Sequence, residues 1–207
     1  MALSVCEIFY SIQGESTWSG YPCVFIRLAG CNLRCAYCDT RYAYSQGAPM
    51  EIGQILERVK SLQCGMVEVT GGEPLIQPET PLLITKLLGE GLTVLLETNG
   101  SIDIGALDPR CVRIVDIKCP SSGMAEENEL RNLEKLTPQD ELKFVLGNRA
   151  DYEFSRDLLT SFPSLPCKKN FSPVFGSLDP RTLAEWILED HLPVRLNLQI
   201  HKIVKLP

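Results

Sequence analysis

The chain has 207 residues, of which 44% are hydrophobic and 22% are charged, a composition typical of a soluble globular protein. This length supports one continuous core, so we expect a single domain covering residues 1–207. No segment approaches the roughly 20 apolar residues that span a bilayer, and no secretion signal is recognisable, which predicts a cytoplasmic protein without a membrane partner. The net charge of −6 and the lack of a basic block argue against a nucleic-acid partner.

Short runs rich in β-branched residues alternate along the chain with stretches in which apolar residues recur at helical spacing. The predicted strands are residues 22–29, 66–70, 92–98, 112–117, 141–146 and 194–200. The predicted helices are residues 51–62, 81–88, 150–159 and 180–189, the last with Asp179 as its N-cap and Pro180 as its first residue. Residues 120–138 and 163–178 are less regular and are predicted to form loops or short helices.

The alternation of strands and helices predicts an α/β protein with a parallel sheet. About six βα units fall short of the eight in a closed (β/α)8 barrel, so the sequence favours a partial, open TIM-like barrel. Functional residues of such sheets gather at the carboxyl ends of the strands. Residues 31–38, 70–74, 97–100 and 116–118 all follow or end predicted strands, and these segments are therefore expected to meet at one face.

Three cysteines, Cys31, Cys35 and Cys38, directly follow the first predicted strand with the spacing C-x3-C-x2-C. Thiolates are the usual ligands of iron–sulfur clusters, and three of them leave one iron of a 4Fe–4S cluster open to a substrate or cofactor. A structural zinc site is the alternative. Zinc prefers four ligands, however, and the sequence offers no second pair, since His191 and His201 lie far downstream. The other six cysteines are scattered, and most are expected to be small buried hydrophobic residues.

The cysteine spacing, with Tyr37 before the last cysteine, resembles the signature of the radical S-adenosylmethionine (SAM) enzymes. Residues 70–74, Thr-Gly-Gly-Glu-Pro, resemble the segment whose backbone binds the SAM amino group in those enzymes, although alone they could be a turn. Residues 7–15, Arg27, the pair Asp39 and Thr40, and residues 199–207 together resemble the 7-carboxy-7-deazaguanine synthase family. The resemblance implies the radical SAM fold.

This resemblance implies a lyase that converts 6-carboxy-5,6,7,8-tetrahydropterin to 7-carboxy-7-deazaguanine with release of ammonia. The reaction is a ring contraction in the biosynthesis of 7-deazapurines such as the queuosine precursor. The implied cofactors are a 4Fe–4S cluster, SAM and Mg²⁺. The implied partners are a pterin substrate, a flavodoxin or ferredoxin as electron donor, and a second copy of the chain in a homodimer.

The resemblance also assigns roles to individual residues. The cluster ligands and catalytic residues would be Cys31, Cys35 and Cys38, and Thr40 would bind Mg²⁺. The SAM contacts would be Tyr37, Cys38, Asp39, Gly72, Asp116, Ile117, Lys118, Ser172, Pro173, Val174 and Phe175. The substrate contacts would be Ile12, Gln13, Gly14, Glu15, Arg27, Thr70, His201 and the terminal carboxylate of Pro207.

Each of these assignments has a simpler alternative. Arg27 suits a substrate carboxylate because its planar guanidinium donates paired hydrogen bonds, but it could equally form a surface ion pair. Asp116 and Lys118 could pair with each other, and Lys143 could be a buried ion-pair member or a site residue. His201 could be structural.

Residues 97–99 are candidates to line the SAM ribose or the substrate, but residues 97–100 could also be a strand end closed by an Asn-Gly turn. Thr40 and Asp39 could cap the turn that follows the cysteines. The polar residues 12–15 could simply form a turn before the first predicted strand.

Two other functions stay open at this point. An activating enzyme for a glycyl-radical protein would share the cysteine motif and the partial barrel, but such enzymes often carry extra ferredoxin-like cysteines that are missing here. A non-catalytic electron carrier would need four protein ligands and would not need the Gly-Gly-Glu-Pro segment.

Overall fold

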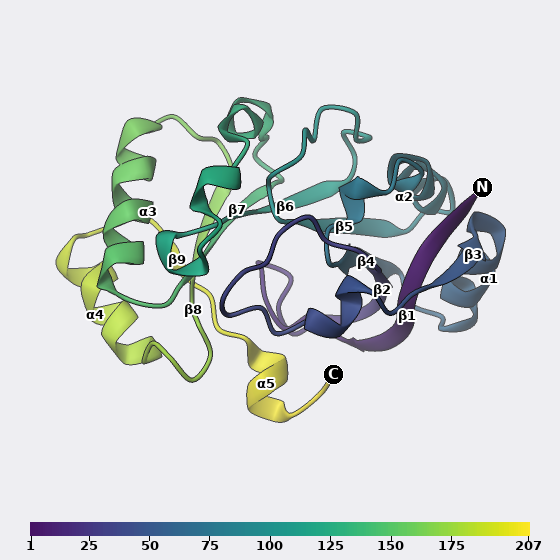
Figure 1. Cartoon of the computed structure of the whole chain (residues 1–207), viewed down its shortest axis with the longest axis horizontal. Coiled ribbons are helices and arrows are strands. Elements are labelled where there is room, and N and C mark those ends of the chain that lie inside the picture. The colour runs from purple at the N-terminus through teal and green to yellow at the C-terminus, as the bar shows by residue number, and fades with distance from the viewer.

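The computed structural model, which describes residues 1–207, contains a curved sheet of nine strands in the order β3-β1-β2-β4-β5-β6-β7-β8-β9 (Figure 1). The strands are β1 (Ala2–Ile12), β2 (Pro22–Leu28), β3 (Ala48–Glu51), β4 (Met66–Gly71), β5 (Thr93–Thr98), β6 (Val112–Ile117), β7 (Glu141–Leu146), β8 (Lys168–Pro173) and β9 (Arg195–Leu196). The helices are α1 (Ile52–Ser61), α2 (Thr80–Gly89), α3 (Arg149–Ser161), α4 (Pro180–Glu189) and α5 (Ile200–Val204), and short 3-10 turns occur between them.

The seven strands from β2 to β9 in this order run parallel to one another, whereas β1 is antiparallel to both β2 and β3. The two edge strands, β3 and β9, do not pair, so the sheet is an open barrel. This confirms the predicted α/β class with a partial barrel. Helices α1 and α2 lie at one end of the molecule and α3 and α4 at the other (Figure 1).

Five of the six predicted strands are confirmed, and the sixth is confirmed only in part. Only Arg195–Leu196 of the predicted strand 194–200 join the sheet, and α5 begins at Ile200. Side-chain hydrogen bonds hold the residues between them, because Asn197 Nδ2 donates to Ser172 Oγ (2.8 Å) and Gln199 Nε2 donates to Glu15 Oε1 (2.7 Å). Strands β1, β3 and β8 were not predicted. The sequence of β8, Lys-Lys-Asn-Phe-Ser-Pro, has too few β-branched residues to be recognised.

The four predicted helices are confirmed within about two residues at each end. The predicted start of α4 is also confirmed, since Asp179 is the N-cap, its side chain accepts a hydrogen bond from the Arg181 backbone N–H (3.0 Å), and Pro180 is the first helical residue. None of the helices combines the length and apolar character needed to cross a membrane.

The two faces of the sheet carry different cores. The main cluster has 32 buried residues, runs in sequence from Leu3 to Ile187 and includes Val24 and Ile26. The intervening residues Cys23 and Phe25 belong to a six-residue cluster on the opposite, concave face. Side chains alternate between faces along a strand. The residues that continue this second series toward the carboxyl ends of their strands are polar: Arg27, Glu68, Thr70, Glu97, Asp116 and Lys143.

Candidate active site

A cavity of about 240 Å³ lies where these polar side chains meet, at the carboxyl ends of the parallel strands. Most of the residues that the resemblance assigns to a site line this cavity. They are Ile12, Gln13, Gly14, Glu15, Arg27, Cys31, Cys35, Tyr37, Cys38, Asp39, Thr40, Thr70, Gly72, Asp116, Lys118, Val174, Phe175, His201 and Pro207. Segments from both ends and the middle of the chain therefore form one site.

Three assigned residues lie outside the lining of this cavity. Ile117 is fully buried and belongs to the main core on the other face of the sheet. Ser172 is 1% exposed and its hydroxyl accepts the hydrogen bond from Asn197. Pro173 borders a smaller neighbouring cavity of about 140 Å³, next to Phe175 and Ile203.

The three cysteines lie in the loop that follows β2, and all of them are partly exposed free thiols at the cavity. Two arginines stabilise this loop: Arg34 Nη1 donates to the Cys31 carbonyl (2.8 Å), and Arg41 Nη2 donates to the Ala36 carbonyl (2.7 Å). Burial raises the pKa of the Cys35 thiol. These two hydrogen bonds hold the backbone of the cysteine loop in place.

No group of three or more His, Cys, Asp or Glu side chains in the structure is close enough to hold a single metal ion. An iron–sulfur cluster makes a different demand, because each thiolate binds its own iron. Three separated thiols on one loop at a cavity therefore fit a 4Fe–4S cluster with one open iron.

The glycine pair after β4 lies against the cysteine loop. A Cβ on Gly72 would overlap the Gly30 carbonyl and come within 2.8 Å of the Cys31 Cβ, so only glycine fits there. The next residue, Glu73, is fully buried and does not line the cavity. Its carboxylate accepts hydrogen bonds from Thr98 Oγ1 (2.9 Å) and the Asn99 backbone N–H (2.6 Å), which joins the ends of β4 and β5.

Asp116 and Lys118 both line the cavity and also form the predicted ion pair, with 2.7 Å between Lys118 Nζ and Asp116 Oδ2. Although burial alone would lower the pKa of Lys118, the charge of Asp116 raises it above its usual value. The other carboxylate oxygen, Asp116 Oδ1, is buried without a hydrogen-bond partner. An unpaired buried acceptor is costly, so this atom is suited to a donor group on a bound ligand such as SAM.

Arg27 was considered either as a site residue or as a member of an ion pair, and it is both. It lines the cavity and pairs with Glu7 through Nε (2.7 Å). Its guanidinium carbon lies 5.6 Å from the centre of the Phe9 ring and 5.9 Å from that of Tyr42. The two terminal nitrogens have no acceptor in the structure, so they can bind a carboxylate.

Gln13 is 3% exposed, and both ends of its amide are used within the protein. Nε2 donates to the Glu68 carboxylate, and Oε1 accepts from the Glu15 backbone N–H (2.7 Å). Glu68 was not predicted as a site residue, although a glutamate inside the otherwise apolar segment 66–69 is a signal that could have revealed it. Burial raises the pKa of Glu68 well above its usual value.

Lys143 is both a buried ion-pair member and a cavity residue. Its Nζ lies 2.6 Å from Glu15 Oε2 and 2.6 Å from Glu97 Oε1. Burial opposes the charge of Lys143, but the two carboxylates raise its pKa well above the usual value. In return Lys143 outweighs the effect of burial on Glu97 and lowers the pKa of that carboxyl.

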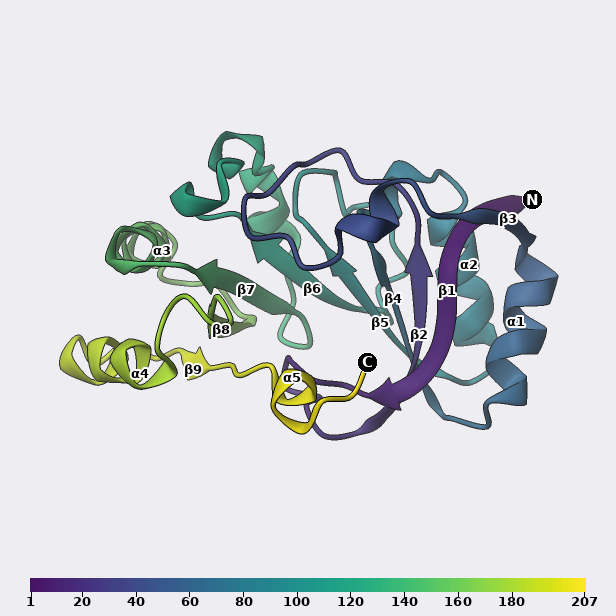
Figure 2. The ribbon, with the colours of Figure 1, turned by 60° about the horizontal axis from the view of Figure 1, so that its bottom comes forward.

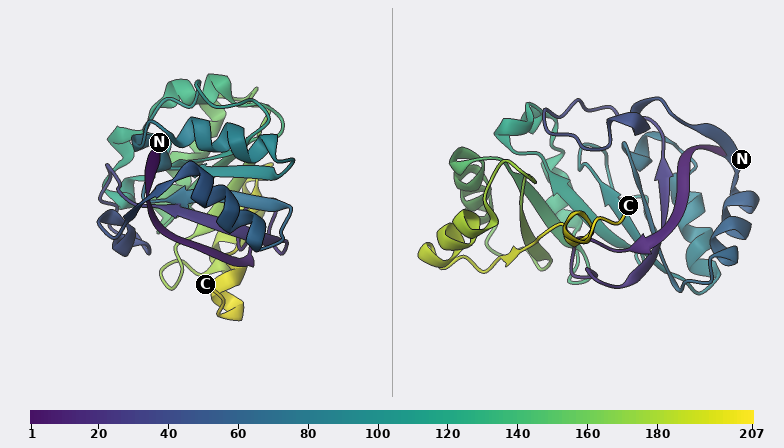
Figure 3. Two further views of the ribbon diagram at one scale, coloured as in Figure 1. Left: turned by 90° about the vertical axis from the view of Figure 1, so that its right-hand side faces the viewer. Right: turned by 90° about the horizontal axis from the view of Figure 1, so that it is seen from below.

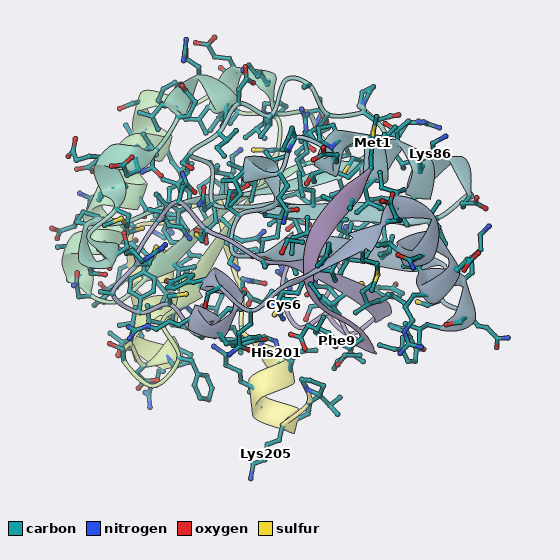
Figure 4. All side chains as sticks on the ribbon, turned by 45° about the vertical axis from the view of Figure 1, so that its right-hand side comes forward. Met1, Cys6, Phe9, Lys86, His201 and Lys205 are labelled. Atoms are coloured by element: carbon teal, nitrogen blue, oxygen red, sulfur yellow. The ribbon has the colours of Figure 1, made fainter.

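The end of the chain crosses the open side of the sheet, between the end of β1 and the β8–β9 edge (Figure 2; Figure 3, right). His201 points from α5 back toward the body of the molecule, while Lys205 points away from it (Figure 4). A Cβ on Gly14 would overlap the His201 ring, and burial lowers the pKa of His201. Ser11 Oγ donates to the Pro207 carbonyl oxygen (2.8 Å), which holds the terminus at the cavity.

Asp39 and Thr40 supply oxygen atoms beside the cysteines. The Thr40 hydroxyl donates to Asp39 Oδ1 (3.0 Å), and Lys202 Nζ lies 2.5 Å from Asp39 Oδ2. Thr40 is the N-cap of a short 3-10 turn, but its side chain makes no capping hydrogen bond. A hydroxyl and a carboxylate are oxygen ligands of the kind that Mg²⁺ prefers.

Comparison with known proteins agrees with this geometry. Residues 25–113 match the model of the radical SAM superfamily. The chain is 47% identical to a 7-carboxy-7-deazaguanine synthase of Chlorobaculum tepidum, over 98% of this chain and 94% of that protein. It is 43% identical to a protein of the same name from Koribacter versatilis, over 99% and 98% of the two chains.

The crystal structure of QueE from Escherichia coli has the same fold, with a TM-score of 0.82 over 96% of this chain and 94% of that one, at 24% identity. The matches in sequence extend over nearly the whole length of this chain. The chain therefore belongs to the 7-carboxy-7-deazaguanine synthase family of radical SAM enzymes.

Proposed function

We propose that this protein converts 6-carboxy-5,6,7,8-tetrahydropterin to 7-carboxy-7-deazaguanine with release of ammonia, and that the cavity described above is its active site. The observation that carries the proposal is the meeting of the cysteine loop, the glycine pair and the C-terminal segment at this cavity, in a chain of this family. No feature of the site favours the protein substrate that a glycyl-radical activating enzyme would bind.

Cys31, Cys35 and Cys38 would hold the 4Fe–4S cluster, with SAM on the open iron. When bound, the cluster and SAM supply the one-electron chemistry, and the protein binds, orients and shields the reactants. Tyr37, the Gly72 backbone and the unpaired Asp116 Oδ1 are placed to contact SAM. Val174 and Phe175 would cover it on the side toward α5.

The substrate would lie between the C-terminal segment and the concave face of the sheet. The free terminal nitrogens of Arg27 are suited to its carboxylate, through charge-assisted hydrogen bonds. Glu15 and the backbone of residues 12–14 would accept and donate hydrogen bonds at the ring edge, with His201 and Pro207 on the opposite side. Thr40 would bind Mg²⁺ next to the substrate carboxylate.

The electron donor, oligomeric state and location belong to the same proposal. We expect a flavodoxin or a ferredoxin as donor, a homodimer, and a cytoplasmic location. These expectations follow from the family resemblance described for the sequence.

The test is turnover by the protein reconstituted with iron and sulfide in the absence of oxygen. With SAM, Mg²⁺, a reductant and 6-carboxy-5,6,7,8-tetrahydropterin, mass spectrometry should detect 7-carboxy-7-deazaguanine. Formation of 5′-deoxyadenosine with intact pterin would refute the substrate assignment and leave the radical SAM chemistry standing.

A pair of cysteine variants tests the cluster ligands. Cys35→Ser should lose most of the bound iron, because a hydroxyl is a poor ligand for such clusters. Cys64→Ser is the matched control, since Cys64 is also a partly exposed free thiol but lies outside the cavity. Equal iron content in the two variants would contradict the assignment.

A further inference from the structure

A single buried ammonium joins two carboxylates inside the cavity. Lys143 is 5% exposed, and Glu15 and Glu97 each place a carboxylate oxygen 2.6 Å from its Nζ. Glu15 comes from the loop after β1 and Glu97 from the end of β5, so three separate segments meet at one nitrogen. A buried lysine is costly without such partners, which explains why the three groups occur together.

The sheet register explains how Lys143 reaches both partners. Lys143 is paired with Asp116 on β6, and β6 separates it from β5, which carries Glu97. Its side chain therefore extends across β6 on the concave face. The loop after β1 is fixed to the same strand, β7, because the Thr17 hydroxyl donates to Glu141 Oε1 (2.5 Å). Lys143 and Glu141, which both lie on β7, thus hold the loop after β1 over the sheet.

Both carboxylates keep acceptor positions for a ligand. Glu15 Oε1 accepts a hydrogen bond from Gln199 Nε2 (2.7 Å), Glu15 Oε2 has no hydrogen-bond partner beyond its ion pair, and the second oxygen of Glu97 has only a 3.4 Å contact with the Thr70 hydroxyl. A carboxylate offers about four lone-pair positions. Ring N–H and amino groups are the donors that such a pair of carboxylates binds.

We infer that Lys143 is a positioning residue for substrate recognition, which holds Glu15 and Glu97 as a pair of charged acceptors for the N–H donors of the substrate ring. The inference rests on the proposed function, which supplies a ring rich in N–H donors. Without the ammonium the two carboxylates would face each other, and one of them would take up a proton. The O–H of a protonated carboxyl is a hydrogen-bond donor and would face an N–H donor of the substrate ring. Substrate binding would therefore weaken.

Other ionisable groups surround this trio, and most of them already have partners. Arg27 pairs with Glu7, Asp116 with Lys118, and Asp39 with Lys202, while Glu68 accepts from Gln13. His201 also faces the cavity, from α5. Lys118 also favours the charged form of Glu97, but its ammonium is already paired with Asp116, so it compensates only in part for a lost lysine.

The test compares Lys143→Met with Lys143→Arg in the reconstituted protein with SAM and without reductant, so that no turnover occurs. Calorimetric titration with 6-carboxy-5,6,7,8-tetrahydropterin should give a Kd at least about tenfold weaker for Lys143→Met, because two acceptors are misplaced. The Kd of Lys143→Arg should lie within about threefold of the wild type. SAM affinity should change less than about twofold in both.

The pH dependence separates positioning from a general loss of structure. The ratio of the Kd of Lys143→Met to that of the wild type should fall as the pH rises between about 6 and 9, because the shared proton is lost. Lys135→Met, which breaks an ion pair with Asp103 away from the cavity, should leave the Kd unchanged at every pH.

Two further outcomes complete the test. If Lys143→Met folds poorly, adding Glu97→Gln removes the repulsion between the carboxylates and should restore stability while binding stays weak. Recovery of wild-type binding in that double variant, or a constant Kd ratio across this pH range, would overturn the inference. If the wild-type protein binds no pterin, the proposed function itself is refuted, and with it this role of Lys143. If only the predictions for the Lys143 variants fail, the proposed function stands.

Discussion

Glu68 is a carboxyl group whose ionisation is opposed both by burial and by a neighbouring negative charge. The residue lies in the middle of β4 on the concave face, is 2% exposed, and makes its side-chain hydrogen bond with Gln13. Burial, followed by the nearby charge of Glu97, raises its pKa. The folded protein therefore keeps a proton that the unfolded chain releases at lower pH, and the stability that this proton provides is lost as the pH rises toward the folded-state pKa.

We expect Glu68→Gln to raise the free energy of unfolding, by an amount that grows with pH and reaches about 1–2 kcal/mol near pH 8. The amide removes the cost of ionising a buried carboxyl, and its oxygen can still accept from Gln13. Urea unfolding at a series of pH values measures this. Glu57→Gln on α1 is the control, because Glu57 is exposed and should show no such trend. A gain independent of pH would contradict the argument.

Gly72 lies directly against the cysteine loop. An added methyl group would meet the Gly30 carbonyl and Cys31 Cβ, so Gly72→Ala should displace the cysteine loop and lower the iron bound per chain after reconstitution. Gly53→Ala in α1 meets no atom within 4 Å and should stabilise the protein by about 0.5–1 kcal/mol. Unchanged iron content in Gly72→Ala, with normal circular dichroism, would show that the loop tolerates the methyl group.

Among the elements, α3 supports the cysteine loop from a distance. Its buried Asp151 accepts hydrogen bonds from the backbone N–H groups of Ser121 (2.8 Å) and Gly147 (2.7 Å). The segment that contains Ser121 continues to Ser122, whose carbonyl accepts from the Ala36 N–H (2.9 Å) between two of the cysteines. The start of α3, the loop after β6 and the cysteine loop therefore form one connected series.

Asp151→Asn should lower the free energy of unfolding by about 1.5–3 kcal/mol, since it replaces a charged acceptor of several hydrogen bonds. Asp157→Asn on the same helix is the matched control, because its side chain is 69% exposed and its ion pair with Arg156 should contribute less than about 1 kcal/mol. Denaturant unfolding of both variants measures the difference. Similar values for the two would mean that the contacts of Asp151 do not stabilise the protein.

Over the whole molecule, the interactions that stabilise the sheet and helices differ from those that hold the cysteine loop. The main core of 32 residues joins the outer face of the sheet to α1, α2, α3 and α4, and it includes no residue from 29–51. The loop itself buries few large side chains, among them Leu33 (2% exposed). Removal of the cluster should therefore leave the core intact.

Chelation of the iron should leave the far-ultraviolet circular dichroism unchanged and speed up amide hydrogen exchange mainly in residues 30–45. Few buried contacts hold this loop, and local opening is easiest in such segments. Faster exchange throughout the sheet, or loss of the cooperative unfolding transition, would show instead that the cluster is needed for the fold.

Local sequence patterns predicted much of this architecture. The strands around residues 24, 67, 95, 114 and 143 and the four longer helices follow from hydrophobic periodicity, which depends on near neighbours in the chain. β1 was missed because its alternation is weak: of its eleven residues only Leu3 and Val5 are buried. A strand was predicted for residues 194–200, but the contacts of Gln199 and Ile200 with residues 14 and 15 place the start of α5 over the cavity.

The sequence by itself determined the α/β class, the three-cysteine motif that leaves one iron of a cluster open, and the family. The spacing and order of residues along the chain carry this information. Only the tertiary structure decided that Lys143 joins Glu15 to Glu97, that Gln13 is bound to Glu68, and that Ile117 and Ser172 lie outside the cavity. The physical reason is that side-chain alternation assigns each residue to a face, but the partner across that face comes from a distant segment. Such partners are fixed only when the whole sheet curves around its polar face and brings these segments together.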